Sequence, residues 1–358
     1  MAKNIQFTFL LLTIVATLLV GSLAGTVLKL VNKYHVNGPK TRSELLTQML
    51  QRDNSNGAGT APLVAGRYNG SVTGHYFAKI KMGTPAQELL MDIDTGSDIT
   101  WMNCFYKGKQ LEQNATGSIF NADNSTSFSE IQCGSSTCQD IPNSNWCGSP
   151  SFGGRRTSGQ NTSCGLFFSY RGESVRLVLA NDTVTFDLTN GTKTQLRDVL
   201  VGCSDYSSDI DGAIGGASGV LGLRNNSLSL RSKASESLGT NLSYCFLDPL
   251  TPINTSSYLI FGSHEDVDIP FDQEMQYTEL VPAGDDGSYY GLNIKDVCVN
   301  RECNILMNLS TKPLEFNSKG NGGVVVDTGS LVTLLVEEAY TPIIRAINTS
   351  FVGFNISI

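Results

Sequence analysis

The tetrapeptide Asp-Thr-Gly-Ser occurs twice in this chain, at Asp94–Ser97 and again at Asp327–Ser330. Each copy directly follows an apolar run that is typical of a β-strand, residues 89–93 for the first copy and 324–326 for the second. Glycine at the third position lets the backbone turn sharply or pack very closely against another segment. The sequence therefore predicts two stiff turns, each of which presents a carboxylate beside a small hydroxyl group.

Two such turns that face each other bring two carboxylates close together. Like charges at short range do not both ionise, so one pKa rises and the pair shares one proton. One group then acts as an acid and the other as a base, as general acid–base hydrolysis requires. A single copy could be an ordinary turn, but its recurrence after two apolar strands favours a paired site made of Asp94 and Asp327.

Five further motifs lie around the two turns. They are Gly83-Thr84-Pro85, Gly202-Cys203, Gly219-Val220-Leu221-Gly222-Leu223, Ser243-Tyr244-Cys245 and Gly322-Gly323. With these motifs the chain, from about Lys29 to its last residue, resembles the pepsin-like aspartic endopeptidases, most of all the plant nepenthesin-like branch. The resemblance implies an all-β, bilobal pepsin-like β-barrel architecture. The second lobe is expected to be incomplete, because the chain ends 28 residues after Ser330 and family members continue well beyond that point.

The resemblance implies that Asp94 and Asp327 share a proton across a bound water. One carboxylate takes a proton from the water as it attacks the scissile carbonyl, and the other donates to the carbonyl oxygen. The two threonines would lock the loops together, and the two serines would hydrogen-bond the outer carboxylate oxygens, unless they are simple turn hydroxyls. Neither a cofactor nor a metal is expected. The residues expected to support the catalytic loops are Thr95, Gly96, Ser97, Thr328, Gly329 and Ser330.

A substrate-covering hairpin, or flap, is the next feature that the resemblance implies. Trp101 would support a flap tyrosine, for which Tyr170 is the candidate; the alternative is an ordinary strand tyrosine. The family segment reads Tyr-Gly-Asp-Gly-Ser, whereas residues 170–174 read Tyr-Arg-Gly-Glu-Ser. Loss of the first glycine predicts a stiffer hairpin tip. Residues 219–222 would thread beneath the first catalytic loop and hold it rigid.

Four segments are expected along the chain. Residues 1–24 read as a signal peptide, with an uncleaved membrane anchor as the alternative. Residues 25–62 are basic and resemble an inhibitory prosegment, with a flexible linker as the alternative. Residues 63–249 would form the N-terminal catalytic lobe, where short apolar runs between Gly, Ser, Thr and Asn predict β-structure. Residues 250–358 would form a partial C-terminal catalytic lobe.

Helices are expected in few places. Helical spacing is present over about 228–238, and a second helix is expected from Glu337, interrupted near Pro342. The chain carries 25 basic and 33 acidic residues, of which six basic and two acidic ones precede residue 63. The remaining body therefore has a net charge of −12. This acidic balance argues against nucleic acid as a partner, because phosphate binding needs a basic surface.

The cysteines and glycosylation motifs fit an oxidising compartment. With a signal peptide in front, the nine cysteines indicate disulfides, and the odd count leaves at least one thiol unpaired. The resemblance implies that this thiol is Cys245, because family members carry its expected partner beyond the point where this chain ends. Zinc is the alternative, but paired Cys-x-x-Cys spacings are missing. Asn-x-Ser/Thr motifs suit a glycoprotein. They begin at Asn69, Asn114, Asn124, Asn161, Asn181, Asn190, Asn225, Asn241, Asn254, Asn308, Asn348 and Asn355.

Together these features predict a secreted aspartic endopeptidase, made as a zymogen, that hydrolyses polypeptides at acidic pH. A monomer is expected, outside the cell or in the vacuole or another endomembrane lumen. The first alternative is a non-catalytic binding protein on the same fold, such as the plant inhibitors of glycoside hydrolases, although those usually lose a catalytic residue. The second is an inactive truncated isoform.

Overall fold

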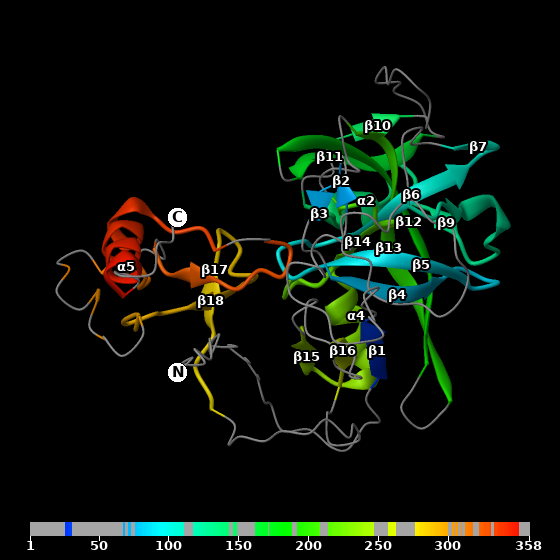
Figure 1. The fold of residues 1–358 in the computed structure, drawn as a ribbon. Helices are drawn as coiled ribbons and strands as arrows, with labels where there is room; N and C mark the ends of the chain where they lie inside the picture. Colours follow the sequence, from blue (N-terminus) through cyan, green and yellow to red (C-terminus); the bar gives the residue numbers. More distant parts are fainter. Residues whose placement is uncertain are drawn as a thin grey trace.

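The computed structural model describes residues 26–30, 67–68, 71–72, 76–110, 117–142, 146–148, 162–170, 172–187, 192–207, 214–246, 257–262, 276–299, 303, 305–306, 309, 312–317, 322–330 and 333–350. Strands dominate these residues, and they form a larger and a smaller part that lie side by side (Figure 1). This architecture confirms the expected all-β, bilobal fold.

The large part is organised around one sheet, and the small part carries a sheet of its own. The strands are β1 (Thr26–Leu30), β2 (Arg67–Tyr68), β3 (Ser71–Val72), β4 (Phe77–Met82), β5 (Gln87–Asp94), β6 (Thr100–Tyr106), β7 (Lys109–Gln110), β8 (Phe120–Asn121), β9 (Ser129–Glu130), β10 (Trp146–Gly148), β11 (Ser163–Tyr170), β12 (Glu173–Asp187), β13 (Lys193–Ser207), β14 (Gly219–Gly222), β15 (Leu242–Cys245), β16 (Ser257–Phe261), β17 (Val281–Ala283), β18 (Tyr289–Leu292) and β19 (Val324–Val325). The helices are η2 (Ala122–Asn124), α2 (Ser136–Asp140), α4 (Leu230–Leu238) and α5 (Glu337–Ser350).

The large sheet has 14 strands, and its main path runs β10-β11-β12-β13-β6-β14-β5-β4-β1-β16-β15. Apolar side chains at alternate positions of β4 and β5 point into one core, which also contains Trp101 at 1% exposure. Burial of such large side chains is the main stabilising contribution to a fold of this kind. The sheet therefore gives the first Asp-Thr-Gly-Ser turn, at the end of β5, a rigid base.

Strand β14 lies between β5 and β6 and holds the first turn from below. It runs parallel to β5, with Gly219 opposite Met91 and Gly222 opposite Asp94, and antiparallel to β6. A methyl group built on Gly222 would lie 2.5 Å from the carbonyl oxygen of Asp98, so no larger residue fits there. Residues 219–222 thus run alongside the strand that leads to the Asp94 turn, where they were expected to lie.

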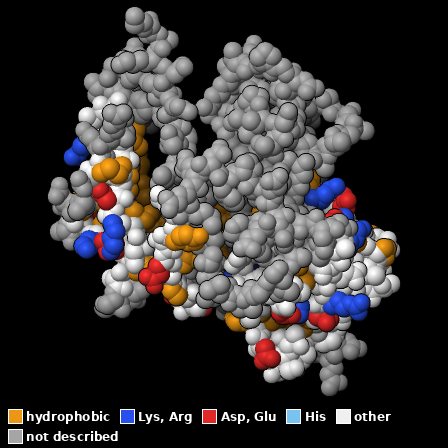
Figure 2. Space-filling model, turned by 90° about the horizontal axis from the view of Figure 1, so that it is seen from below, with side chains coloured by type: hydrophobic (Ala, Val, Ile, Leu, Met, Phe, Trp, Pro, Cys, Tyr) orange, Lys and Arg blue, Asp and Glu red, His pale blue; other side chains and the backbone are white. Residues whose placement is uncertain are grey.

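The small part has a short sheet and a modest core. Its strands run in the order β17-β18-β19, and α5 lies beside them (Figure 1). Its described core consists of Leu306, Leu314 and Ala339, with partly buried apolar neighbours. Figure 2 shows hydrophobic side chains on the surface of this part, at the left of the view. Lys, Arg, Asp and Glu side chains lie on both parts in the same view.

Both expected helices are present, with one correction. The first is α4, which begins at Leu230 with Ser229 as its N-cap. The expected interruption near Pro342 is wrong, because α5 continues through this proline to Ser350. Pro342 is the sixth residue of the helix, so it removes only one backbone hydrogen bond close to the N-terminal end.

Two strands of the large sheet come from segments that were expected to lie outside the N-terminal lobe. Strand β1 falls within the segment expected as the prosegment, and it pairs along its whole length with β16. At its end, Leu30 also pairs with Ala78 of β4. Strand β16 itself follows residue 250 in the chain and pairs with β15. The segments on both sides of the first lobe therefore contribute to its sheet.

Four disulfides account for eight of the nine cysteines. Cys104–Cys203 joins β6 to β13, Cys133–Cys147 and Cys138–Cys164 staple the region around α2, and Cys298–Cys303 closes a short loop of the small part. Cys245 is free, which confirms the expectation for the odd thiol.

Several expectations fall outside the described residues. The signal peptide (1–24), all of the expected prosegment except β1, and the asparagines of seven of the twelve glycosylation motifs lie there. Among the residues that the structure does describe, no helix is long and apolar enough to cross a membrane. Within the same described residues, no group of three or more His, Cys, Asp or Glu side chains is arranged to hold a metal ion.

Candidate active site

The two Asp-Thr-Gly-Ser turns face each other across the boundary between the large and small parts. A methyl group built on Gly96 would lie 2.9 Å from Oδ1 of Asp327, and one built on Gly329 would lie 2.5 Å from Oδ1 of Asp94. Each carboxylate thus packs directly against the glycine of the opposite turn. Glycine is required at both positions because of this close approach, and any side chain there would push the carboxylates apart.

Four hydrogen bonds lock the two turns together through their threonines. The backbone N–H of Thr95 donates to Oγ1 of Thr328 at 3.1 Å, and the N–H of Thr328 donates to Oγ1 of Thr95 at 3.0 Å. The hydroxyl of Thr95 donates to the carbonyl of Val326 at 3.2 Å, and that of Thr328 to the carbonyl of Ile93 at 2.9 Å. These reciprocal bonds give the pair of loops approximate two-fold symmetry.

Each carboxylate is also held within its own turn. Asp94 accepts a hydrogen bond from the N–H of Gly96 at Oδ1 (2.7 Å) and from the hydroxyl of Ser97 at Oδ2 (2.6 Å). Asp327 accepts the corresponding bonds from Gly329 N–H (2.9 Å) and the Ser330 hydroxyl (2.8 Å). In each turn the backbone N–H of the glycine and the hydroxyl of the serine donate to different oxygens of the carboxylate. These donors orient both acids.

The environment of the second carboxylate favours its protonated form. Burial raises the pKa of Asp327, and the neighbouring Asp94 carboxylate raises it further, while the Ser330 hydroxyl and the Gly329 N–H act in the opposite direction. Asp94 itself is buried, at 4% exposure. The site thus places a carboxyl group of raised pKa, that of Asp327, beside the second, buried carboxyl group of Asp94.

Tyr170 contacts the carboxylate of Asp94. It ends β11, and the β11–β12 hairpin turns back at once, with Tyr170 paired to Glu173. Its hydroxyl donates to Oδ2 of Asp94 at 2.9 Å, and its ring packs edge-on against Trp101, with centroids 5.7 Å apart. Gly172 adopts a positive φ of 90° in this tight turn. The candidate flap tyrosine thus lies directly against the Asp94 carboxylate.

The two turns are supported unequally. The Asp94 turn is backed by β14, whereas β19, which leads to Asp327, has two residues and pairs only with β18 among the described strands. The N–H of Val326 donates to the carbonyl of Tyr290 at 2.9 Å and extends this pairing to the residue before Asp327. The second turn therefore depends strongly on its contacts with the first lobe.

A cluster that the sequence reading did not single out lies beside the first turn. Asp98, the residue after Ser97, forms an ion pair with Arg224, with Nη1 and Oδ1 2.9 Å apart. Burial raises the pKa of Asp98, and the Arg224 charge opposes that shift. The Arg224 guanidinium also stacks 3.6 Å from the ring centroid of Tyr289 in β18. An aspartate directly beside a catalytic turn is the signal that could have suggested a buried partner of opposite charge.

Comparisons with known proteins agree with this geometry. Residues 76–263 match the family profile described as xylanase inhibitor N-terminal, and residues 289–357 match the one described as xylanase inhibitor C-terminal. The chain is 30% identical over 279 residues to Protein ASPARTIC PROTEASE IN GUARD CELL 2 of Arabidopsis thaliana, covering 78% of this chain and 52% of that protein. It is 26% identical over 277 residues to aspartic proteinase nepenthesin-2 of Nepenthes gracilis, covering 76% of this chain and 55% of that protein.

Solved structures show the same fold at low sequence identity. The structure named edgp superposes with a TM-score of 0.60 at 18% identity, covering 94% of this chain and 72% of that one. Basic 7S globulin from soybean superposes with a TM-score of 0.54 at 17% identity, covering 93% and 69%. The chain spans about half of the length of the curated relatives above. The family profiles cover more than half of this chain, and it therefore belongs to the family of xylanase inhibitor-like domains of the pepsin type, to which the plant aspartic proteases above are similar.

Proposed function

We propose that this protein is an aspartic endopeptidase that hydrolyses extended polypeptides at acidic pH. The observation that carries the proposal is the pair of facing turns, in which each carboxylate packs against the glycine of the other turn and the pKa of Asp327 is raised. The nepenthesin-like branch remains part of the proposal, supported by the matches to plant aspartic proteases.

The unequal environments of the two acids assign their roles. Asp327, whose protonated form is favoured by burial and by its neighbour, would carry the shared proton and donate it to the carbonyl oxygen of the scissile bond. Asp94 accepts hydrogen bonds from Gly96, Ser97 and Tyr170, so its oxygens already act as acceptors, and it would take a proton from the attacking water. Asp94 then passes the proton that it took from water to the leaving nitrogen. As the C–N bond breaks, Asp327 takes a proton back from a hydroxyl of the tetrahedral intermediate, and both acids return to their starting state.

Substrate entry requires the β11–β12 hairpin to move. The Tyr170 hydroxyl occupies Oδ2 of Asp94, so a peptide can lie across the dyad only after this hydrogen bond breaks. Hairpins that open for substrate and close over it are a common way to exclude water from such a site. The short turn around Gly172 makes this hairpin stiffer than a longer glycine-rich tip would be.

The test is cleavage of acid-denatured globin at about pH 3.5, where one of two paired carboxyls is still ionised. Wild-type protein should cleave it, and the aspartic-protease inhibitor pepstatin, Asp94→Asn and Asp327→Asn should each abolish cleavage. A wild-type preparation that is folded, yet neither cleaves globin nor binds pepstatin, would refute the proposal.

A non-catalytic, protein-binding role is the second candidate. The family profiles that match the chain are described as xylanase inhibitor domains, and this favours a role in binding a glycoside hydrolase. Binding of a xylanase without any globin cleavage would support this second role. For localisation we propose secretion or an endomembrane lumen, on the basis of the apolar leader and the four disulfides. The mass of the secreted product would test both the leader and the prosegment.

A further inference from the structure

Arg224 is fixed to the first catalytic loop from two directions. Its backbone N–H donates to the carbonyl of Ser97 at 3.0 Å, and its guanidinium pairs with Asp98 at 2.9 Å. The side chain is only 13% exposed, so this pair is better shielded from solvent than the surface ion pairs of the protein. An additional donor to Asp98, the amide of Asn226, completes the group. Arg224 is therefore a rigid feature of the first lobe.

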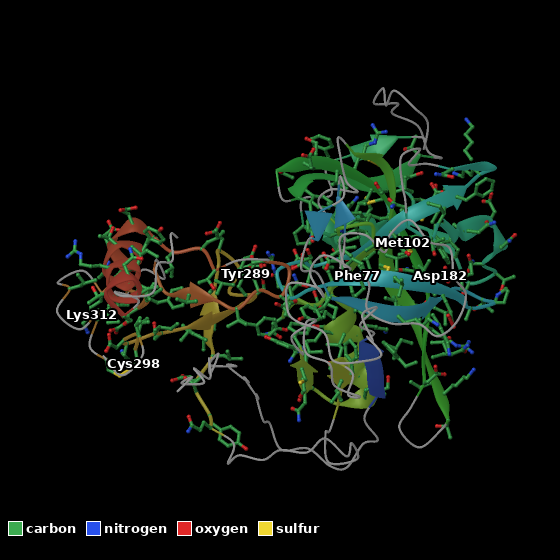
Figure 3. All side chains as sticks on the ribbon, in the orientation of Figure 1. Phe77, Met102, Asp182, Tyr289, Cys298 and Lys312 are labelled. Carbon is green, nitrogen blue, oxygen red and sulfur yellow. A yellow bond between two sulfur atoms is a disulfide. The ribbon has the colours of Figure 1, made fainter. Side chains whose placement is uncertain are left out.

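The planar face of the same guanidinium contacts the second lobe. It lies 3.6 Å from the ring centroid of Tyr289, at the start of β18. Figure 3 shows Tyr289 on the side of the small part that faces the large sheet. The next residue of β18, Tyr290, accepts the hydrogen bond from Val326, which directly precedes Asp327. One side chain thus connects the first catalytic loop with the strand that supports the second.

Two hydrogen bonds between the lobes flank this connection and fix its geometry. The N–H of Asn225 donates to the carbonyl of Ser288 at 3.1 Å, and the hydroxyl of Tyr290 donates to the carbonyl of Leu223 at 2.8 Å. Asp286 in turn accepts hydrogen bonds from the N–H and the hydroxyl of Ser288 at 3.1 and 2.7 Å. The ring of Tyr289 is consequently held in register with Arg224.

An arginine suits this position for a physical reason. A guanidinium is planar, so its edge can bind a carboxylate while its face stacks on an aromatic ring. A lysine ammonium can pair with Asp98 but offers no plane for Tyr289. The contact matters because the Asp327 turn has no described counterpart of β14 to hold it, so displacement of β18 would shift Asp327 relative to Asp94.

We propose that Arg224 is a positioning residue that sets the second catalytic loop against the first through Tyr289. The inference rests on the proposed endopeptidase function and deepens it, because it names what aligns the two acids across the lobe boundary. Misplacement of a reacting group by about 1 Å costs about 100-fold in rate, so a partial loss of alignment should lower kcat by about 10- to 100-fold. KM should change less than kcat, because Arg224 acts on the acids rather than on substrate.

The experiment compares variants of this protein on a quenched peptide substrate. Arg224→Met and Tyr289→Leu should each lower kcat by about 10-fold or more, and their combination should be no worse than either alone. Tyr289→Phe keeps the ring and should retain wild-type kcat. Lys233→Met, which removes an ion pair with Glu236 on the surface of α4, is the matched control and should have no effect. Equal kcat for Tyr289→Phe and Tyr289→Leu, or fully additive losses in the double variant, would overturn the proposal.

A second measurement separates this inference from the proposed function. Hydrogen exchange of the amides of Val326, Thr328 and Gly329 reports the order of the second loop whether or not the protein is catalytic. Tyr289→Leu and Arg224→Met should increase exchange there, whereas Lys233→Met and Tyr289→Phe should not. If the wild type fails to cleave globin while exchange follows this pattern, only the enzymatic proposal fails. If cleavage is present and exchange at these amides is unchanged in Arg224→Met and Tyr289→Leu, only the positioning proposal fails. Should Arg224→Met not fold, the two Tyr289 variants still decide the outcome.

Discussion

The substitution Gly329→Ala tests the facing arrangement of the two turns most directly. A methyl group at this position would lie 2.5 Å from Oδ1 of Asp94, whereas an ordinary contact between such atoms is about 3.5 Å. The Asp94 carboxylate, or the whole second turn, must therefore move by about 1 Å. Neither glycine of the pair has a positive φ, so the effect is steric and does not come from backbone strain.

The magnitude follows from this displacement. A misplacement of about 1 Å at a reacting group lowers kcat by about 100-fold, and overpacking of a tight contact destabilises by about 1–3 kcal/mol. At Gly96 the corresponding methyl group would lie 2.9 Å from Oδ1 of Asp327, so Gly96→Ala should have the smaller effect. Steady-state kinetics on a quenched peptide at acidic pH and urea denaturation measure the two quantities.

Gly108→Ala is the control for a general loss of stability. Gly108 has a φ of 72°, and a methyl group there would meet no atom within 4 Å, so the variant pays for backbone strain alone. It should lose some stability and retain kcat. Wild-type kcat in Gly329→Ala would refute the reasoning, because a chain whose turns really face each other cannot accommodate that methyl group without moving a catalytic acid.

Three further predictions follow from the site and the fold. The raised pKa of Asp327 means that the folded state favours its protonated form. The free energy of unfolding of wild type relative to Asp327→Asn should therefore be highest at low pH and should fall as pH rises through that pKa. Urea denaturation of both proteins over a pH series measures this difference, and a difference that does not change with pH would contradict the prediction. Tyr170→Phe removes a hydrogen bond that holds the hairpin over Asp94, so pepstatin should bind more tightly, by up to about tenfold, in calorimetric titration; weaker binding would show that the hydroxyl contacts the inhibitor instead. Replacement of the Cys104–Cys203 disulfide by two serines should lower the free energy of unfolding by about 2–5 kcal/mol, because the bond closes a loop with a sequence separation of 99, and loss of Cys298–Cys303, with a separation of 5, should cost less in the same denaturation assay.

Much of the fold class could be predicted from local patterns. Alternating and apolar runs between turn residues indicated the strands, and helical spacing indicated α4 and the start of α5. The repeated Asp-Thr-Gly-Ser turns singled out both acids, and the odd number of cysteines predicted one free thiol, which the family resemblance placed at Cys245. These features depend on the chemistry of neighbouring residues along the chain, so the sequence displays them directly.

Tertiary structure decided how these pieces meet. The contact of Gly329 with Asp94, the raised pKa of Asp327 and the hydrogen bond from Tyr170 each join residues that are far apart in the chain. The contacts that connect Asp98 with Arg224 and Arg224 with Tyr289 also join residues that are far apart in the chain. Such contacts depend on strand order and register, and no local periodicity encodes them. The sequence by itself therefore determined which two acids this protein presents, and only the packing of one lobe against the other determined that they lie together and unequally buried.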